Sequence, residues 1–93
     1  MIKWKKATRA ECNMTSFVGE INTTYARLVE VFGPPHITGG DKVNSEWIIK
    51  FNTGEVATIY DWKMPYTPTD DYDWHIGGHK SGVVAKVLAL VNE

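Results

Sequence analysis

The stretch DWHIGGHKSG, residues 73–82, holds the side chains of this chain that are best suited to chemistry. It contains two histidines, an aspartate, a lysine and a serine among three glycines. His75 and His79 are four residues apart, the spacing at which two histidines on one face of a helix bind zinc. Asp73 adds a carboxylate, but two glycines interrupt such a helix here, and the other candidate ligands, Cys12 and His36, are remote in sequence. We therefore predict neither a metal site nor a cofactor.

The end of the same stretch looks like a phosphate-binding loop, because it finishes in Lys80-Ser81. A Walker loop needs glycine immediately before the lysine, and here that position holds His79. The backbone N–H groups that open the following helix, together with Lys80 and Ser81, remain able to bind an anion. The simpler interpretation is that Gly77 and Gly78 turn the chain and that Ser81 caps the helix.

Acid–base catalysis has little support. His75 or His79 close to Asp61 or Asp73 would make an acid–base pair, but no motif positions a nucleophile. Asp61 is predicted to face the covered side of a sheet, where a lone carboxylate is costly. It would then need a partner such as Lys63, Lys80, a histidine or a backbone N–H, and we expect a structural ion pair. The sequence therefore favours a protein that is not an enzyme.

Composition places the chain among ordinary globular proteins. Its 93 residues predict one domain, residues 1–93, with 43% hydrophobic and 23% charged residues. The net charge of -1 does not favour direct nucleic-acid binding. A single cysteine, Cys12, excludes an internal disulfide and is typical of a reducing compartment. No apolar run approaches the length of a membrane span, so we expect a cytoplasmic protein that does not bind membranes.

The first twelve residues are basic, and we predict that they form a segment distinct from an α+β core over residues 13–93. Their four cations would give only weak, salt-sensitive binding to nucleic acid, so a solvated tail is the preferred interpretation. Residues 2–4 are compatible with a short strand. Thr8-Arg9-Ala10-Glu11 has the form of a capping box. The sequence does not decide between these structures.

Stronger patterns predict the core elements. Residues 15–21 predict a strand with a bulge at Gly19. Residues 25–32 predict a helix that ends at Gly33 and two prolines. The last helix, residues 82–92, carries an apolar stripe at helical spacing: Val84, Val87, Leu88 and Val91.

Residues 45–51 and 55–62 predict a β-hairpin, with Asn52-Thr53-Gly54 as a three-residue loop. This loop pairs Trp47 with Ile59 and Ile49 with Ala57, whereas a two-residue loop would shift the register by one residue. Residues 72–76 predict the next strand. The fold class is therefore α+β, with an antiparallel sheet of three to four strands and two helices packed on one face.

Two helices can cover one face of such a sheet but not both. The other face is then exposed and carries Ile48, Tyr60 and Trp62. Exposed aromatic clusters are unusual without a partner, and tyrosine and tryptophan often anchor protein interfaces. We therefore predict a protein-binding surface with a rim from the following loop: Tyr66, Asp70, Asp71 and Tyr72.

Much of the chain resembles a group of small, mostly uncharacterised accessory proteins encoded by bacteriophages and some other large DNA viruses. The resemblance covers roughly residues 15–91, and the loops after Pro35 and over residues 64–72 depart from it. It rests on these positions: Phe32-Gly33 with the proline that follows, Trp47, Gly54, Ala57-Thr58-Ile59-Tyr60-Asp61, Lys63 and Trp74-His75-Ile76-Gly77-Gly78.

The resemblance implies a viral accessory protein and no particular activity. Small phage proteins often act on host machinery, including defence systems such as CRISPR effectors. We expect a non-enzymatic inhibitor of a host protein, with no prediction of its oligomeric state. The alternative is a protein that sequesters a nucleotide-like ligand, with an aromatic ring stacked on the base, from Trp62 or Trp74, and nearby groups that meet the phosphate: Lys63, His75, His79 and Lys80.

Overall fold

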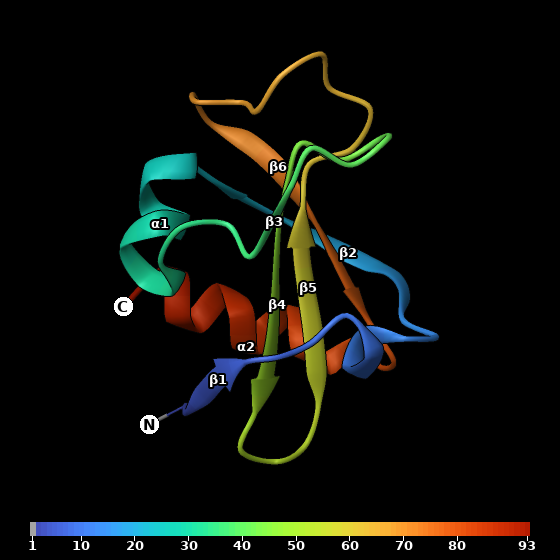
Figure 1. Cartoon of the computed structure of the whole chain (residues 1–93). Coiled ribbons are helices and arrows are strands. Elements are labelled where there is room, and N and C mark those ends of the chain that lie inside the picture. Colours follow the sequence, from blue (N-terminus) through green and yellow to red (C-terminus); the bar gives the residue numbers. More distant parts are fainter. Residues whose placement is uncertain (1) are drawn as a thin grey trace.

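The computed structural model describes residues 2–93 and shows two α-helices against a six-stranded antiparallel sheet (Figure 1). The helices are α1 (Tyr25–Phe32) and α2 (Gly82–Val91), and a 3₁₀ turn, η1, spans Ala10–Cys12. The strands are β1 (Trp4–Lys6), β2 (Ser16–Thr23), β3 (Ile37–Thr38), β4 (Ser45–Phe51), β5 (Val56–Tyr60) and β6 (Tyr72–Gly78).

The strand order is β1-β4-β5-β6-β2, and β3 also pairs with β4. The α+β class and the two helices agree with the sequence, but the predicted sheet of three to four strands was too small. Strands β1 and β3 are only three and two residues long. Both are too short to show a periodic pattern, and the pairing of β1 with β4 is a contact between distant segments.

The β4–β5 hairpin has the predicted register. Trp47 lies opposite Ile59 and Ile49 opposite Ala57. The backbone N–H of Phe51 donates to the carbonyl of Glu55 at 2.8 Å, which closes the three-residue loop. Gly54 takes a φ of +96°, a conformation that side chains disfavour. The predicted bulge in β2 is also present, as a register shift between Phe17 and Gly19.

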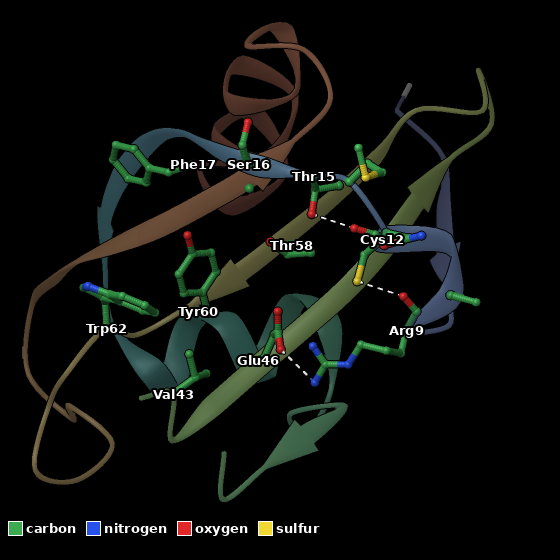
Figure 2. Close-up of a pocket in the computed structure, with 14 residues that line it drawn as sticks. Arg9, Cys12, Thr15, Ser16, Phe17, Val43, Glu46, Thr58, Tyr60 and Trp62 are labelled. Carbon is green, nitrogen blue, oxygen red and sulfur yellow. Dashed lines mark hydrogen bonds and ion pairs between the residues drawn. The ribbon is translucent and has the colours of Figure 1, made fainter. Parts of the chain in front are cut away.

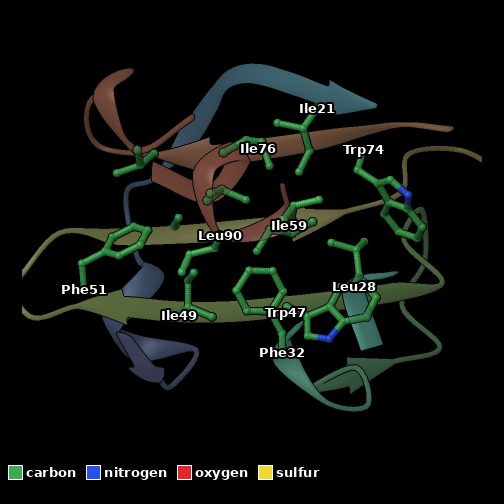
Figure 3. Packing of buried hydrophobic residues seen from close by; sticks show 14 residues of the cluster. Ile21, Leu28, Phe32, Trp47, Ile49, Phe51, Ile59, Trp74, Ile76 and Leu90 are labelled. Atoms are coloured by element: carbon green, nitrogen blue, oxygen red, sulfur yellow. The ribbon is translucent and has the colours of Figure 1, made fainter. Parts of the chain in front are cut away.

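The main core lies between the sheet and the two helices (Figure 3). Helix α1 begins where the Thr24 hydroxyl accepts a hydrogen bond from the Arg27 N–H at 3.1 Å, and it ends at Gly33 as predicted. Alternate residues of the central strands point into this core from the same face of the sheet: Trp47, Ile49, Phe51, Ala57, Ile59, Trp74 and Ile76.

Helix α2 is rotated relative to the prediction. It buries Val83, Val87, Leu90 and Val91, whereas Leu88 is exposed. The helix is apolar on most sides, so its packing partners decide which stripe faces the sheet. Ser81 stands at the N-cap position, but its side chain makes no capping hydrogen bond, so that part of the prediction was wrong.

Gly77 and Gly78 belong to β6 and do not form the turn that was predicted for them. A Cβ on Gly77 would lie 2.4 Å from the Thr58 hydroxyl, and one on Gly78 would lie 2.7 Å from a Val83 methyl. Such distances are too short for real side chains. These glycines therefore permit close packing on the two faces of the sheet.

The N-terminal segment is part of the fold and not the solvated tail that was predicted; Met1 lies outside the described residues. After β1, the Ala7 N–H donates to the Ile48 carbonyl at 2.8 Å. The capping box forms, because Thr8 N donates to a Glu11 carboxylate oxygen at 3.0 Å. The segment crosses the face opposite α2 (Figure 1). There Ala7 and Cys12 bury Ile48, which is only 1% exposed, in a second small core.

This second core predicts that Ile48→Ala lowers the free energy of unfolding by about 2–4 kcal/mol, because a buried isoleucine is lost and a cavity remains. Leu88→Ala, on the exposed side of α2, is the control and should change it by about 0.5 kcal/mol or less. Urea unfolding of the two variants measures both values. Equal effects would contradict the burial of Ile48 beneath the N-terminal segment.

Candidate functional site

The face of the sheet opposite the helices carries two rows of side chains across four strands. They follow from the register of β4, β5, β6 and β2. One row runs Glu46, Tyr60, His75 and Glu20, so two rings stand between two carboxylates. The second row runs Ile48, Thr58, Gly77 and Phe17.

The N-terminal segment covers only part of this face and leaves a cleft beside η1 (Figure 2). Its main cavity has a volume of about 600 Å³, and an adjoining one of about 380 Å³ shares three aromatic residues with it and adds His75. We call the two together the open-face cleft. Their size is within the usual range for ligand sites. The lining residues that matter here are Arg9, Phe17, Glu46, Thr58, Tyr60 and Trp62.

Four rings, the aromatic patch, line the cleft: Phe17, Tyr60, Trp62 and His75. Neighbouring ring centroids lie 5.1 Å apart for Phe17 and His75, 5.5 Å for Tyr60 and His75, and 6.2 Å for Tyr60 and Trp62. These spacings are typical of favourable aromatic pairs. Phe17 is 54% exposed and Trp62 40% exposed, so the patch presents apolar surface to solvent.

Hydrogen bonds fix the backbone at Trp62 and at the residue that follows it. The Trp62 N–H donates to the Tyr72 hydroxyl at 3.1 Å, and the Lys63 N–H donates to the Lys42 carbonyl at 2.8 Å. Lys63 has a φ of +56°, which turns the chain sharply after β5. The exposed indole is therefore placed before any partner arrives.

Asp61, which immediately precedes Trp62, is fully buried and accepts three hydrogen bonds. One carboxylate oxygen accepts from the backbone N–H groups of Asn44 and Ser45, at 2.8 and 3.0 Å, and the other accepts from the Asn44 side-chain amide at 2.7 Å. No ion pair involves Asp61 among residues 2–93, so the expected structural ion pair was wrong. The backbone N–H partner, also considered, is the one present.

Glu46 supplies a negative charge to the cleft. Its side chain is only 12% exposed, and Arg9, 64% exposed, places Nη2 at 3.4 Å from Oε1. Burial raises the pKa of the Glu46 carboxyl, and the Arg9 charge offsets part of this effect. Burial, followed by the charge of Glu46, likewise raises the pKa of the Tyr60 phenol.

The predicted protein-binding residues separate into four groups. Tyr60 and Trp62 line the open-face cleft. Ile48 shares their face of the sheet but is buried, so its predicted exposure was wrong. Tyr72 is half-buried, with its ring 5.3 Å from Trp74. The remaining three are exposed in the loop that follows β5 and do not line the cleft: Tyr66, Asp70 and Asp71.

The residues predicted for an anion or nucleotide are only partly brought together, because Trp62, Lys63 and His75 lie near one another and the others do not. Trp74 is fully buried in the main core, so it cannot stack on a ligand. Lys63 lies beside Trp62 at one end of the sheet. His79 and Lys80 line a separate cavity of about 270 Å³ beside the hairpin loop, where His79 Nε2 lies 2.9 Å from the Asn13 carbonyl oxygen.

The sequence alone missed three residues of the cleft: Arg9, Phe17 and Glu46. Phe17 reaches the aromatic patch because β2 pairs with β6, which places Phe17 opposite Gly77, 60 residues further along the chain. Glu46 alternates with the buried Trp47, so the strand pattern placed it on the open face, but its burial depends on the N-terminal segment. No local sequence signal identifies that segment as a cover.

Comparisons of the chain with protein-family models, with curated proteins and with solved structures find no match. Over residues 2–93, no three histidine, cysteine or acidic side chains are grouped so that they could hold a metal ion. None of the helices in the described part of the chain has the length and apolar character needed to cross a membrane.

The Asp61 hydrogen bonds predict that Asp61→Ala lowers the free energy of unfolding by about 3 kcal/mol, because it leaves buried donors without a partner. Asp73→Ala is the control, since Asp73 is exposed and should matter by about 0.5 kcal/mol or less. Chemical denaturation compares them. Similar losses in both variants would contradict the structural role assigned to Asp61.

The burial of the Glu46 carboxyl predicts a specific pH dependence of the free energy of unfolding. Its pKa is raised above the ordinary 4.5 in the folded state, so its contribution is greatest below that value and falls as pH rises through the folded pKa. The stability of the wild type relative to Glu46→Gln should therefore fall between about pH 4 and pH 7. Chemical denaturation at each pH measures this difference.

Glu55 provides a control of opposite sign. A hydrogen bond from Lys86 lowers the pKa of the Glu55 carboxyl. The stability of the wild type relative to Glu55→Gln should therefore rise with pH up to about pH 5 and stay level above it, because this contribution is lost as pH falls from 4.5 through the lowered folded pKa. Parallel pH profiles for the two variants would contradict the assignment for Glu46.

Proposed function

We propose that this chain is a non-enzymatic binding protein that recognises another protein through the open-face cleft and the aromatic patch. The observation that carries the proposal is the exposed aromatic surface on a sheet face that the helices leave uncovered. Aromatic residues with few freely rotating bonds are frequent anchors of protein interfaces. The fixed backbone around Trp62 supports the proposal, because a preorganised surface loses less entropy on binding.

In its narrower form, the proposal is that the partner is a host protein, such as a defence component, and that binding inhibits it. This form rests on the resemblance to viral accessory proteins. Its test is the activity of the purified partner with and without the chain. Inhibition that saturates at equimolar chain supports it, and unchanged activity of a fully bound partner overturns it.

A nucleotide-like ligand is less well supported. Of the two tryptophans considered for stacking, Trp74 is inaccessible, and the histidine and lysine after β6 lie away from Trp62. A ligand of this kind retained in the native mass of the purified chain, with no protein partner, would favour that alternative.

The proposal predicts that Phe17→Ala combined with Trp62→Ala raises the Kd for the partner by about 100-fold or more, since each interface anchor contributes on the order of 2 kcal/mol. A tagged chain captures the partner from host lysate, and calorimetry with the purified partner then gives the Kd. Leu88→Ala, on α2 beyond the opposite face, is the matched control and should retain wild-type affinity.

Unfolding curves of both variants establish that the domain is intact. Because Phe17 and Trp62 are exposed and neither belongs to the main core, their loss should leave that core unchanged. A folded double variant that keeps wild-type affinity would show that the partner binds elsewhere.

A further inference from the structure

The charge at the bottom of the open-face cleft comes from Glu46. Its side chain is nearly buried, yet no hydrogen bond from residues 2–93 reaches its carboxylate. Arg9 is its ion-pair partner, at 3.4 Å. Charge-assisted N–H···O bonds are usually about 2.7–2.9 Å long. The carboxylate therefore has unused capacity to accept hydrogen bonds, and it faces a cavity.

The ion-pair partner of Glu46, Arg9, does not come from a strand of the sheet. It extends from the turn at η1 across the cleft toward Glu46 (Figure 2). Its side chain is 64% exposed and makes no hydrogen bond with residues 2–93 that would fix it there. The Arg9–Glu46 ion pair shows that the cleft accommodates a guanidinium group. The guanidinium of Arg9 is held there only weakly.

The walls of the cleft also favour a cation. Lys42 and Lys63 place their ammonium groups 5.9 and 5.7 Å from the centroid of the Trp62 ring. Aromatic faces attract cations at about this distance. Neither lysine lines the two cavities of the cleft, although Lys42 lines an adjoining cavity of about 310 Å³ together with Arg9, Glu46 and Trp62. The lysines therefore lie against Trp62, and a further cation in the cleft would face Phe17 and Tyr60.

An anionic ligand fits this arrangement less well. A phosphate placed among the rings would meet the Glu46 carboxylate on one side of Tyr60 and that of Glu20 on the other side of His75. Glu20 lies 3.7 Å from His75 Nε2. The aromatic rings alone would suit a nucleic-acid base, but the charges on both sides of them do not suit its backbone.

We propose that the open-face cleft binds an arginine side chain of the partner protein, which takes the place of Arg9 against Glu46 and lies along the aromatic patch. This proposal rests on the proposed function and specifies the partner's chemistry at the site. Arginine suits the site better than lysine, because its planar group stacks on rings and donates several hydrogen bonds at once.

The probe is N-acetyl-arginine methylamide, titrated into ¹⁵N-labelled chain while the amide signals of Glu46, Thr58 and Tyr60 are followed by NMR. The citrulline analogue is the matched control, because it keeps the shape of arginine and lacks its charge. The arginine probe should shift these signals in a saturable manner, and the citrulline probe should not.

Two variants separate a recognition site from a structural ion pair. Glu46→Gln should raise the Kd of the arginine probe about tenfold, the usual value of one hydrogen bond to a charged group. Arg9→Ala should lower the Kd several-fold, because it removes the competing internal guanidinium. An ion pair with only a structural role would not give opposite effects on the affinity for arginine. Unchanged amide signals outside the cleft verify that both variants are folded.

Equal binding of the citrulline probe, or an unchanged Kd in Glu46→Gln, overturns the proposal. So does a titration in which oligothymidylate shifts the cleft signals and arginine does not, which would identify a surface for nucleic-acid stacking. If arginine fails to bind while the Phe17 and Trp62 double variant has lost the partner, this inference falls and the proposed function stands. If the double variant keeps the partner, the proposed function itself falls.

Discussion

The buried carboxylate of Asp61 is the constraint on which the functional end of the sheet depends. It joins the end of β5 to the first residues of β4 through two backbone N–H groups and the Asn44 amide. The same amide donates to the Met64 carbonyl at 2.9 Å, and Ser45 pairs with the hydroxyl of Thr67. One side chain thus organises the open end of the hairpin and the loop beyond it.

The position of Asp61 also determines where Trp62 stands. Asp61 is buried, and Trp62, the next residue along the chain, is exposed and lines the cleft. The turn at Lys63 then holds the indole at the edge of the open face. The hydrogen bonds of Asp61, whose role is structural, therefore position the indole of Trp62, which is available for recognition.

The sheet is covered unequally on its two faces, and this inequality produces the cleft. The helices cover one face fully, while the first twelve residues reach only the part of the other face above Ile48 and Val56. The remaining part keeps two carboxylates and the aromatic patch. A longer N-terminal segment or a third helix on that side would have closed this surface.

What the sequence predicted well was encoded locally. Gly54 and the alternation around it specify the hairpin register, and Thr24 and Gly33 mark the ends of α1. What it did not predict depends on contacts between distant segments. The pairing of β2 with β6 brings Phe17 to the cleft, and the N-terminal segment buries Ile48.

The same limit applies to smaller details of the fold. The rotation of α2 follows from its fit against close-packed glycines such as Gly78. Its own sequence does not determine the rotation, because the helix is apolar on most sides. The partners of Asp61 come from a loop seventeen and sixteen residues earlier in the chain. Neither can be inferred without the three-dimensional arrangement.

The N-terminal segment has two roles that cannot be separated. It covers the second core through Ala7 and Cys12, and it supplies one wall of the cleft together with Arg9. Local opening of this segment would therefore expose core and dismantle the cleft in one step. By thermodynamic linkage, anything that binds the assembled cleft also holds the segment closed. Occupancy of the cleft is thus coupled to hydrogen exchange at the Ala7 amide, which bonds to Ile48 beneath the segment.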